Sequence, residues 1–202
     1  IDIRVSEKPT GEISAGAGLG TNGGSLAFNV RENNWLGQGK RVGLDFELST
    51  TSLKGEISYT NPNYDLLGNS LTYNLSNVTN DKPDQGYKNS LITTGVSTTF
   101  EQYKNIYASL GINASYDDLS TTSSASKALK KQSGEYSELS GVYGFRYDQR
   151  DRTFMPTAGS IIGFHQTLPI FADKPFIGNT VNASTYHTFN ENIIGAGKFF
   201  IT

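Results

Sequence analysis

The stretch Ile106-Tyr107-Ala108-Ser109-Leu110-Gly111-Ile112-Asn113-Ala114-Ser115-Tyr116 has an apolar or aromatic residue at every second position. The residues between them are mainly small or polar. A period of two is typical of a β-strand whose two faces meet different surroundings. This alternation persists for longer than the ~5–6 residues of an ordinary strand, and it matches the ~9–11 residues with which a tilted strand crosses a membrane. The stretch therefore predicts a membrane-spanning strand.

The same alternation recurs along most of the chain. Clear apolar faces are Ile13/Ala15/Ala17/Leu19, Leu26/Phe28/Val30, Val42/Leu44/Phe46/Leu48, Leu71/Tyr73/Leu75 and Ile92/Thr94/Val96. Looser versions follow around 135–149, 159–169, 177–189 and 193–202. We expect about eleven strands, and one turn of helix near 126–132. One apolar and one polar face on long strands predicts an all-β fold, an antiparallel up-and-down transmembrane β-barrel.

The composition excludes several classes of function. The net charge is −2 and only 18% of the 202 residues are charged, so the chain lacks the basic surface that nucleic acid binding needs. No cysteine is present, which excludes a thiol nucleophile and cysteine-ligated zinc. An aromatic share of 11% argues against disorder. We expect neither a nucleic acid partner nor a cofactor.

The connections between strands are expected to differ in length at the two ends of the sheet. Those near 33–40, 60–69, 100–105, 149–159 and 189–192 are interpreted as generally tighter turns. The alternating set, near 20–24, 49–53, 79–88, 118–135 and 169–177, includes the long polar loops. This asymmetry is typical of outer-membrane barrels, whose aromatic residues gather at the membrane interfaces. Trp35, Tyr64 and Phe154 suit such an interface. A soluble β-sandwich or a β-solenoid adhesin remains an alternative.

Two other patterns point elsewhere but lack their structural context. Gly18-Leu19-Gly20-Thr21-Asn22-Gly23 matches G-x-G-x-x-G, yet a strand-like segment follows it instead of the helix that a dinucleotide site requires. His165 and His187 are the only histidines, and Ser160 and Asp173 lie near them in sequence. No nucleophile elbow accompanies them, so we do not expect an enzyme.

Three turn segments are more specific and resemble a known family. They are Asn33-Asn34-Trp35-Leu36-Gly37-Gln38-Gly39, Thr60-Asn61-Pro62-Asn63-Tyr64 and Asp151-Arg152-Thr153-Phe154-Met155-Pro156-Thr157-Ala158-Gly159-Ser160. Together with Glu7-Lys8-Pro9-Thr10-Gly11 and the Gly-rich segment after it, they resemble the membrane domain of the Omp85 superfamily. The family residues that match are Asn34, Trp35, Leu36, Gly37, Gly39, Asn61, Pro62, Tyr64, Asp151, Arg152, Phe154, Pro156, Thr157 and Gly159.

The resemblance implies an outer-membrane protein assembly factor, which folds and inserts β-barrel proteins into the bacterial outer membrane. It implies that 11–202 form about the first eleven of sixteen barrel strands, so the sequence is expected to be a fragment. Residues 1–10 would be the tail of the last periplasmic POTRA domain. Implied partners are unfolded β-barrel clients, outer-membrane lipids and accessory lipoproteins bound through other POTRA domains. Alternatives are a two-partner secretion or TamA-like translocation pore, and a self-contained barrel enzyme or adhesin.

The first strand is the candidate site, because in the family the barrel seam lies between the first and last strands. Its residues are Glu12, Ile13, Ser14, Ala15, Gly16, Ala17, Gly18, Leu19 and Gly20. The glycines at every second position give one face almost no side chains, so cross-strand packing is minimal and the register is weakly fixed. We expect such an edge to template client strands. Equally, small residues here could make room for contents of the lumen.

Overall fold

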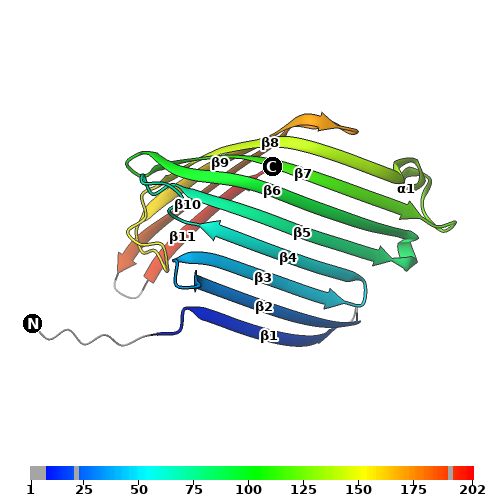
Figure 1. Ribbon diagram of the computed structural model, residues 1–202, viewed down its shortest axis with the longest axis horizontal. Coiled ribbons are helices and arrows are strands. Elements are labelled where there is room, and N and C mark those ends of the chain that lie inside the picture. Colours follow the sequence, from blue (N-terminus) through cyan, green and yellow to red (C-terminus); the bar gives the residue numbers. More distant parts are fainter. Residues whose placement is uncertain (1–7, 21–22, 191–192) are drawn as a thin grey trace, which may run out of the picture. The chain divides into compact units, whose positions relative to one another are not determined.

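A computed structural model describes residues 8–20, 23–190 and 193–202. Within these ranges the chain forms eleven strands and almost no helix, so the predicted all-β class and strand number are confirmed (Figure 1). Most of the segment 1–10, predicted to end a periplasmic domain, lies outside the described residues. The strands are β1 (Gly11–Gly20), β2 (Gly23–Trp35), β3 (Lys40–Ser49), β4 (Ser52–Asn61), β5 (Ser70–Lys82), β6 (Tyr87–Tyr103), β7 (Ile106–Thr121), β8 (Gly134–Asp148), β9 (Gly159–Ala172), β10 (Gly178–Asn190) and β11 (Ile193–Ile201).

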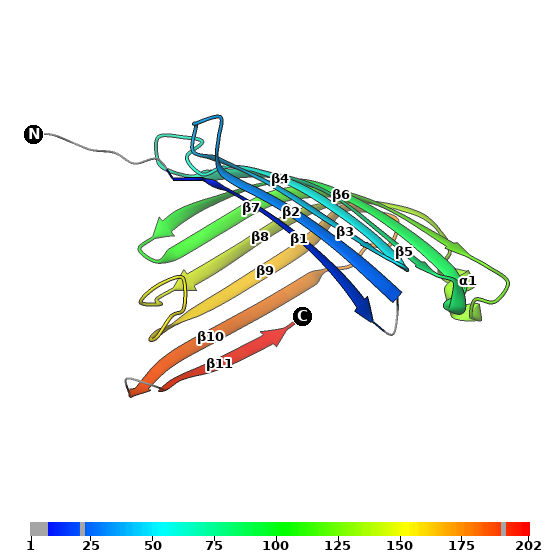
Figure 2. The ribbon, with the colours of Figure 1, turned by 90° about the horizontal axis from the view of Figure 1, so that it is seen from below.

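All eleven strands belong to one sheet whose spatial order is the order of the sequence. Sequential neighbours such as β1–β2, β2–β3 and β9–β10 pair antiparallel, as in a meander. β1 and β11 are the two edge strands (Figures 1 and 2). Among the described residues there is no second sheet, so a β-sandwich does not account for this fold.

The chain divides into two compact units. Unit 1 comprises Ile1–Pro62, Thr72–Thr94 and Ser115–Glu135, and unit 2 comprises Asn63–Leu71, Gly95–Ala114 and Tyr136–Thr202. Strands β1–β4 belong to unit 1 and β9–β11 to unit 2, whereas β5–β8 have residues in both.

The register aligns apolar side chains on one face of the sheet and polar side chains on the other. In unit 1, Ala15 lies opposite Phe28, which lies opposite Phe46, while Asn29 and Asp45 pair on the other face. Of the apolar residues that the structure describes, only Ala108 and Ala125 are buried, and many of the large ones are exposed on the surface. A soluble protein rarely leaves so much apolar surface uncovered. The apolar face is therefore what a strand exposes to lipid.

The one α-helix among the described residues lies in the connection between β7 and β8, and a short 3-10 helix (Pro83–Gln85) lies between β5 and β6. α1 (Lys127–Gln132) forms where one helical turn was predicted, and the Ser126 hydroxyl oxygen caps it by accepting the Leu129 N–H at 3.2 Å. Capping by a serine is a favoured way to start a helix. No helix among the described residues is long and apolar enough to cross a membrane.

The predicted difference in length between the two sets of connections holds for the longest one, 122–133, but not for the sets as a whole. Residues 62–69 and 149–158, expected in the tighter set, join β4 to β5 and β8 to β9 through eight and ten residues, whereas 50–51 in the opposite set is a two-residue turn. The physical reason is that Asp65 and Asp151 organise these longer connections through internal hydrogen bonds. Turn-forming residues in the sequence do not disclose such hydrogen bonds.

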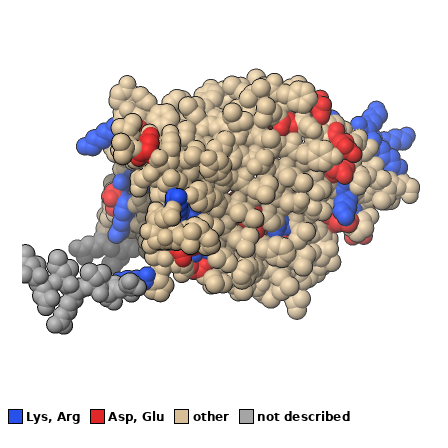
Figure 3. Space-filling view, viewed as in Figure 1, with Lys and Arg blue, Asp and Glu red and all other residues tan. Residues whose placement is uncertain are grey.

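The strands have two kinds of end. At the turn end residues 36–39, 62–69, 104–105 and 149–158 connect successive strands, and at the helix end residues 50–51, 83–86, 122–133 and 173–177 do so. In Figure 3 most charged residues gather toward the ends of the strands, and the surface between them is mainly uncharged.

Candidate functional site

The first strand presents a continuous backbone edge. β1 runs from Gly11 to Gly20, and within the part of the chain that the structure describes it pairs with β2 alone. Every one of its ten residues is exposed. An edge strand carries a row of unpaired N–H and C=O groups, which is a template for pairing with another chain.

The register shows which residues form that edge. Asn33 N–H donates to the Thr10 carbonyl oxygen at 3.1 Å, and the β1–β2 register pairs Gly11 with Glu32. Thr10 and Asn33 are thus a hydrogen-bonded pair. Such pairs alternate along an antiparallel ladder, so the even-numbered residues of β1 bond to β2. The N–H and C=O groups of Ile13, Ala15, Ala17 and Leu19 consequently face the open edge.

The side chains of β1 follow the same alternation. Ser14, Gly16, Gly18 and Gly20 lie on the polar face, opposite Asn29, Ala27, Ser25 and Gly23 of β2. A Cβ atom added to Gly16 or Gly20 would meet nothing within 4 Å, so crowding by the described residues does not demand glycine at either position. The polar face of β1 therefore lacks side-chain contacts where there is space for them.

A hollow lies on each face of β1 and its neighbours. On the polar face, a cavity of about 570 Å³ is lined by Gly16 and by charged residues of β2–β4. Within it Asp45 accepts a hydrogen bond from Asn29 and lies 3.7 Å from Arg31. On the apolar face, a hollow of about 740 Å³ is lined by Ala17, Leu19, Leu26 and Leu48 among others. The edge strand thus has a charged polar side and an apolar side.

The first family turn connects β2 and β3. The Asn34 side-chain oxygen accepts the Gly39 N–H at 2.6 Å, and the Asn34 carbonyl accepts the Gly37 N–H at 2.9 Å. Gly37 and Gly39 have φ values of 72° and 66°, a conformation that glycine adopts without strain. Trp35 and Leu36 lie at the exposed tip. Asn34 and the two glycines therefore set the shape of this turn.

The second family turn follows β4. Asn61 ends the strand, Pro62 opens the connection, and Tyr64 N–H donates to the Asn69 carbonyl at 2.9 Å. The Asp65 carboxylate closes the loop, because it accepts the backbone N–H groups of Leu67 and Asn69, each at 3.0 Å.

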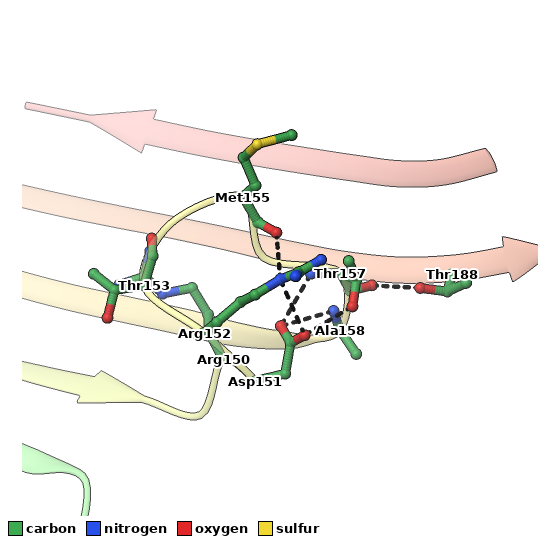
Figure 4. Close-up of polar contacts among 8 residues, drawn as sticks. All are labelled: Arg150, Asp151, Arg152, Thr153, Met155, Thr157, Ala158 and Thr188. Atoms are coloured by element: carbon green, nitrogen blue, oxygen red, sulfur yellow. Dashed lines mark hydrogen bonds and ion pairs between the residues drawn. The ribbon is translucent and has the colours of Figure 1, made fainter. Parts of the chain in front are cut away.

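The third family turn connects β8 to β9 and is organised by Asp151 (Figure 4). Its carboxylate accepts the Thr157 N–H at 2.9 Å, the Thr157 hydroxyl at 2.7 Å and the Ala158 N–H at 3.1 Å. Arg152 donates to the Met155 carbonyl at 2.8 Å. Thr188 of β10 donates its hydroxyl to the Thr157 carbonyl at 2.8 Å, which ties the turn to a neighbouring strand.

The electrostatics of the third turn follow from these contacts. Hydrogen bonds from the Thr157 side chain and from the Ala158 backbone lower the pKa of Asp151 to about 2. Donors to a carboxylate stabilise its charged form. Gly159 closes the turn with φ +93°, and a Cβ atom there would lie 2.1 Å from the Gln149 carbonyl oxygen. Asp151 and Gly159 are therefore structural requirements of this turn.

The residues considered for catalysis do not form a site together. The Asp173 carboxylate accepts the Ser137 N–H at 2.7 Å. His165 pairs across the ladder with Thr180, and His187 packs edge-on against Phe189 with a 5.0 Å centroid separation. In the described ranges, no group of three or more His, Cys, Asp or Glu side chains could hold a metal ion.

Comparison with known proteins identifies the family. A family model described as the Omp85 superfamily domain matches residues 34–200. The chain belongs to the Omp85 superfamily. The resemblance inferred from the three turns is thereby confirmed, and the chain is an outer-membrane sequence with the fold of an Omp85 barrel.

The chain is similar to two proteins named BamA. One is the outer membrane protein assembly factor BamA of Neisseria meningitidis serogroup B, 28% identical over 116 residues, which are 57% of this chain and 13% of that protein. The other is the crystal structure of BamA from Haemophilus ducreyi lacking POTRA domains 1–3, with a TM-score of 0.72 and 24% identity. It covers 92% of this chain and 39% of the solved chain. The structural likeness bears on the fold, and the chain spans well under half the length of either relative.

Sequence reasoning missed two parts of the site. The charged residues of the polar hollow, including Arg31, Asp45 and Lys54, could have been found, because they occupy polar positions of consecutive alternating strands. The division of β1 into residues that bond to β2 and residues that face the open edge could not have been found from the sequence, because it depends on the register with β2. The first-strand residues themselves stay a predicted site.

Proposed function

We propose that this chain is the templating part of an outer-membrane assembly factor. In this proposal it folds β-barrel clients and inserts them into the bacterial outer membrane by pairing their strands with the β1 edge. Omp85 membership and the name of the Neisseria relative, an assembly factor, support the class of activity. The observation that carries the proposal is the row of outward N–H and C=O groups at Ile13, Ala15, Ala17 and Leu19.

The physical need for a template arises in the hydrocarbon. An unpaired backbone group there costs several kcal/mol, so an incoming strand must find hydrogen-bond partners before it enters. β-Augmentation on an exposed edge supplies them without ATP or covalent chemistry. The edge-facing groups of β1 are spaced two residues apart, which is the repeat of an antiparallel partner.

The proposed partners follow from this role. They are unfolded β-barrel clients, outer-membrane lipids, and accessory lipoproteins that bind through POTRA domains of the full-length protein. The polar hollow beside Gly16, with charged residues of both signs, suits the polar face of a client strand, and the apolar hollow beside Leu19 suits its lipid-facing side chains.

The direct test is reconstitution of the full-length protein in liposomes. The rate at which a denatured β-barrel client acquires protease resistance is measured with and without the protein. We expect faster folding than in empty liposomes. Equal rates, with the protein shown to be folded in the bilayer, would overturn the proposal.

A further inference from the structure

The turns at the turn end expose large apolar side chains at their tips. In unit 2, Leu66 and Leu67 are 106% and 86% exposed, and Phe154 and Met155 are 81% and 69% exposed. In unit 1, Leu36 is 77% exposed beside Trp35. Leu66–Leu67, Phe154–Met155 and Leu36 belong to connections, whereas Trp35 is the last residue of β2. An isolated exposed apolar residue needs no explanation, but adjacent pairs repeated on three turns do.

The backbone at two of these tips is held in an unfavourable conformation. Leu36 has φ 53° and Met155 has φ 49°, the left-handed region in which residues other than glycine are strained. In both turns the strained residue is the second of the apolar pair.

Several backbone groups of these turns are hydrogen-bonded within the turn. In the first, Asn34 accepts the Gly37 and Gly39 N–H groups. In the second, Asp65 accepts the Leu67 and Asn69 N–H groups. In the third, the bonds to Asp151 and the donation from Arg152 to the Met155 carbonyl do the same (Figure 4). Backbone that bonds to itself is the kind that tolerates a water-poor environment.

On β7 and β8 the apolar residues of the lipid-facing side extend to the turn end of the strand. On β7 the apolar-facing positions are filled by apolar or aromatic residues from Ile106 to Tyr116 and then turn polar at Asp118 and Ser120. On β8 the same face is polar at Glu135 and Ser137. On this apolar face, every second residue from Leu139 to Tyr147 is aromatic, aliphatic or glycine.

These lengths agree with the ~9–11 residues that cross a bilayer. On both strands the apolar stretch runs to the last residues before the turn, and the polar surplus lies at the helix end. On β7 and β8 the hydrocarbon boundary therefore falls at their turn ends.

We propose that the connections 62–69 and 149–158 of unit 2 contact lipid, with Leu66–Leu67 and Phe154–Met155 inserted among the phospholipids of one leaflet. The partner is the boundary between headgroups and acyl chains. This goes beyond interfacial aromatic residues on strands, because the inserted groups belong to connections that would otherwise be in water. It does not depend on the assembly function.

The test measures what reaches the tips in the full-length protein reconstituted in phosphatidylethanolamine–phosphatidylglycerol bilayers. The 202 residues contain no cysteine, so single spin labels can be placed by Leu66→Cys and Met155→Cys, with native cysteines elsewhere replaced. Lys131→Cys, on the exposed surface of α1, is the matched control. Power saturation then compares collisions with oxygen, which concentrates in lipid, and with a water-soluble nickel complex.

We expect the labels at positions 66 and 155 to collide several-fold more with oxygen relative to nickel than the label at position 131. Equal ratios at all three sites would place the tips in water and overturn the proposal. Low collision rates with both reagents would show that a protein covers the tips, which also overturns it. Because positions 66 and 155 lie in different turns, misfolding of one labelled variant would not decide the result.

Discussion

Replacing Ala15 or Ala17 by proline tests the templating edge. Both residues have odd numbers, so their N–H groups face the open edge and not β2. Proline is tolerated on an edge strand when its missing N–H would point outward. Ala15→Pro therefore removes one donor from the template and leaves the β1–β2 ladder intact. The substitution separates templating from folding.

The expected effect follows from the group that is left without a partner. One client carbonyl would enter the bilayer unpaired, which costs about 1–3 kcal/mol on the scale of mutational data. At about 1.4 kcal/mol for each factor of ten, client folding slows about 5- to 150-fold. Ala17→Pro should have an effect of the same size, because Ala17 occupies an equivalent edge-facing position.

The assay is client folding in proteoliposomes, with two controls. Ser123→Pro, in the connection between β7 and β8, should leave the rate unchanged. Ser14→Pro removes a donor that faces β2, so it should destabilise the protein itself and not the template alone. Folding of each variant is checked by its heat-dependent migration on gels. If Ala15→Pro and Ala17→Pro are folded and accelerate the client like the unmodified protein, β1 is not the template.

Three further predictions concern the turns. Gly159→Ala should lower the free energy of unfolding in guanidinium chloride by at least about 2 kcal/mol, because φ is +93° and a Cβ atom would collide with the Gln149 carbonyl. Gly16→Ala, whose Cβ would meet open space, should change it by less than about 0.5 kcal/mol. Asn34→Ala should cost about 1 kcal/mol through the lost bond to Gly39, and Asn34→Asp, which keeps the acceptor, should recover most of it. The folded-state pKa of Asp151 is lowered from 3.8 to about 2, so its contribution is present above pH ~4 and is lost as the pH falls through about 2. The unmodified protein should therefore lose its stability advantage over Asp151→Asn across that window, and equal pH profiles of the unfolding midpoint would contradict this.

Much of the fold could be predicted because it depends on a period of two. The stretch Ile106–Tyr116 and its counterparts located ten of the eleven strands, since alternation is a local property of the sequence. β4 (Ser52–Asn61) was counted in the expected total of about eleven, but no alternating face was assigned to it. The helical turn at α1 was also predictable from a short segment that lacks this alternation. Strand length and composition also predicted that the apolar face contacts lipid.

The rest could not be predicted because it depends on partners distant in sequence. The ladder irregularity between Leu139 and Ser140, opposite Phe171 and Pro169, shifts the register without any signal in the alternation. The hydrogen bond from Thr188 to the third turn crosses 31 residues. The left-handed conformation of Leu36 is equally invisible in composition, because leucine does not favour it.

The glycines of β1 bear on how a template releases its product. Glycine is required by geometry at Gly159, where a Cβ atom would collide, but at Gly16 and Gly20 the surrounding space is open. Side chains at those positions would add cross-strand contacts of about 0.2–1 kcal/mol each to any partner on the same face. Their absence leaves pairing to the backbone, which every client strand offers whatever its sequence. An edge that binds through the backbone alone accepts many clients and holds each one weakly. On this reasoning Gly16→Thr should slow the release of a bound client strand more than it changes the first encounter, whereas a substitution that merely obstructed the polar hollow would slow the encounter.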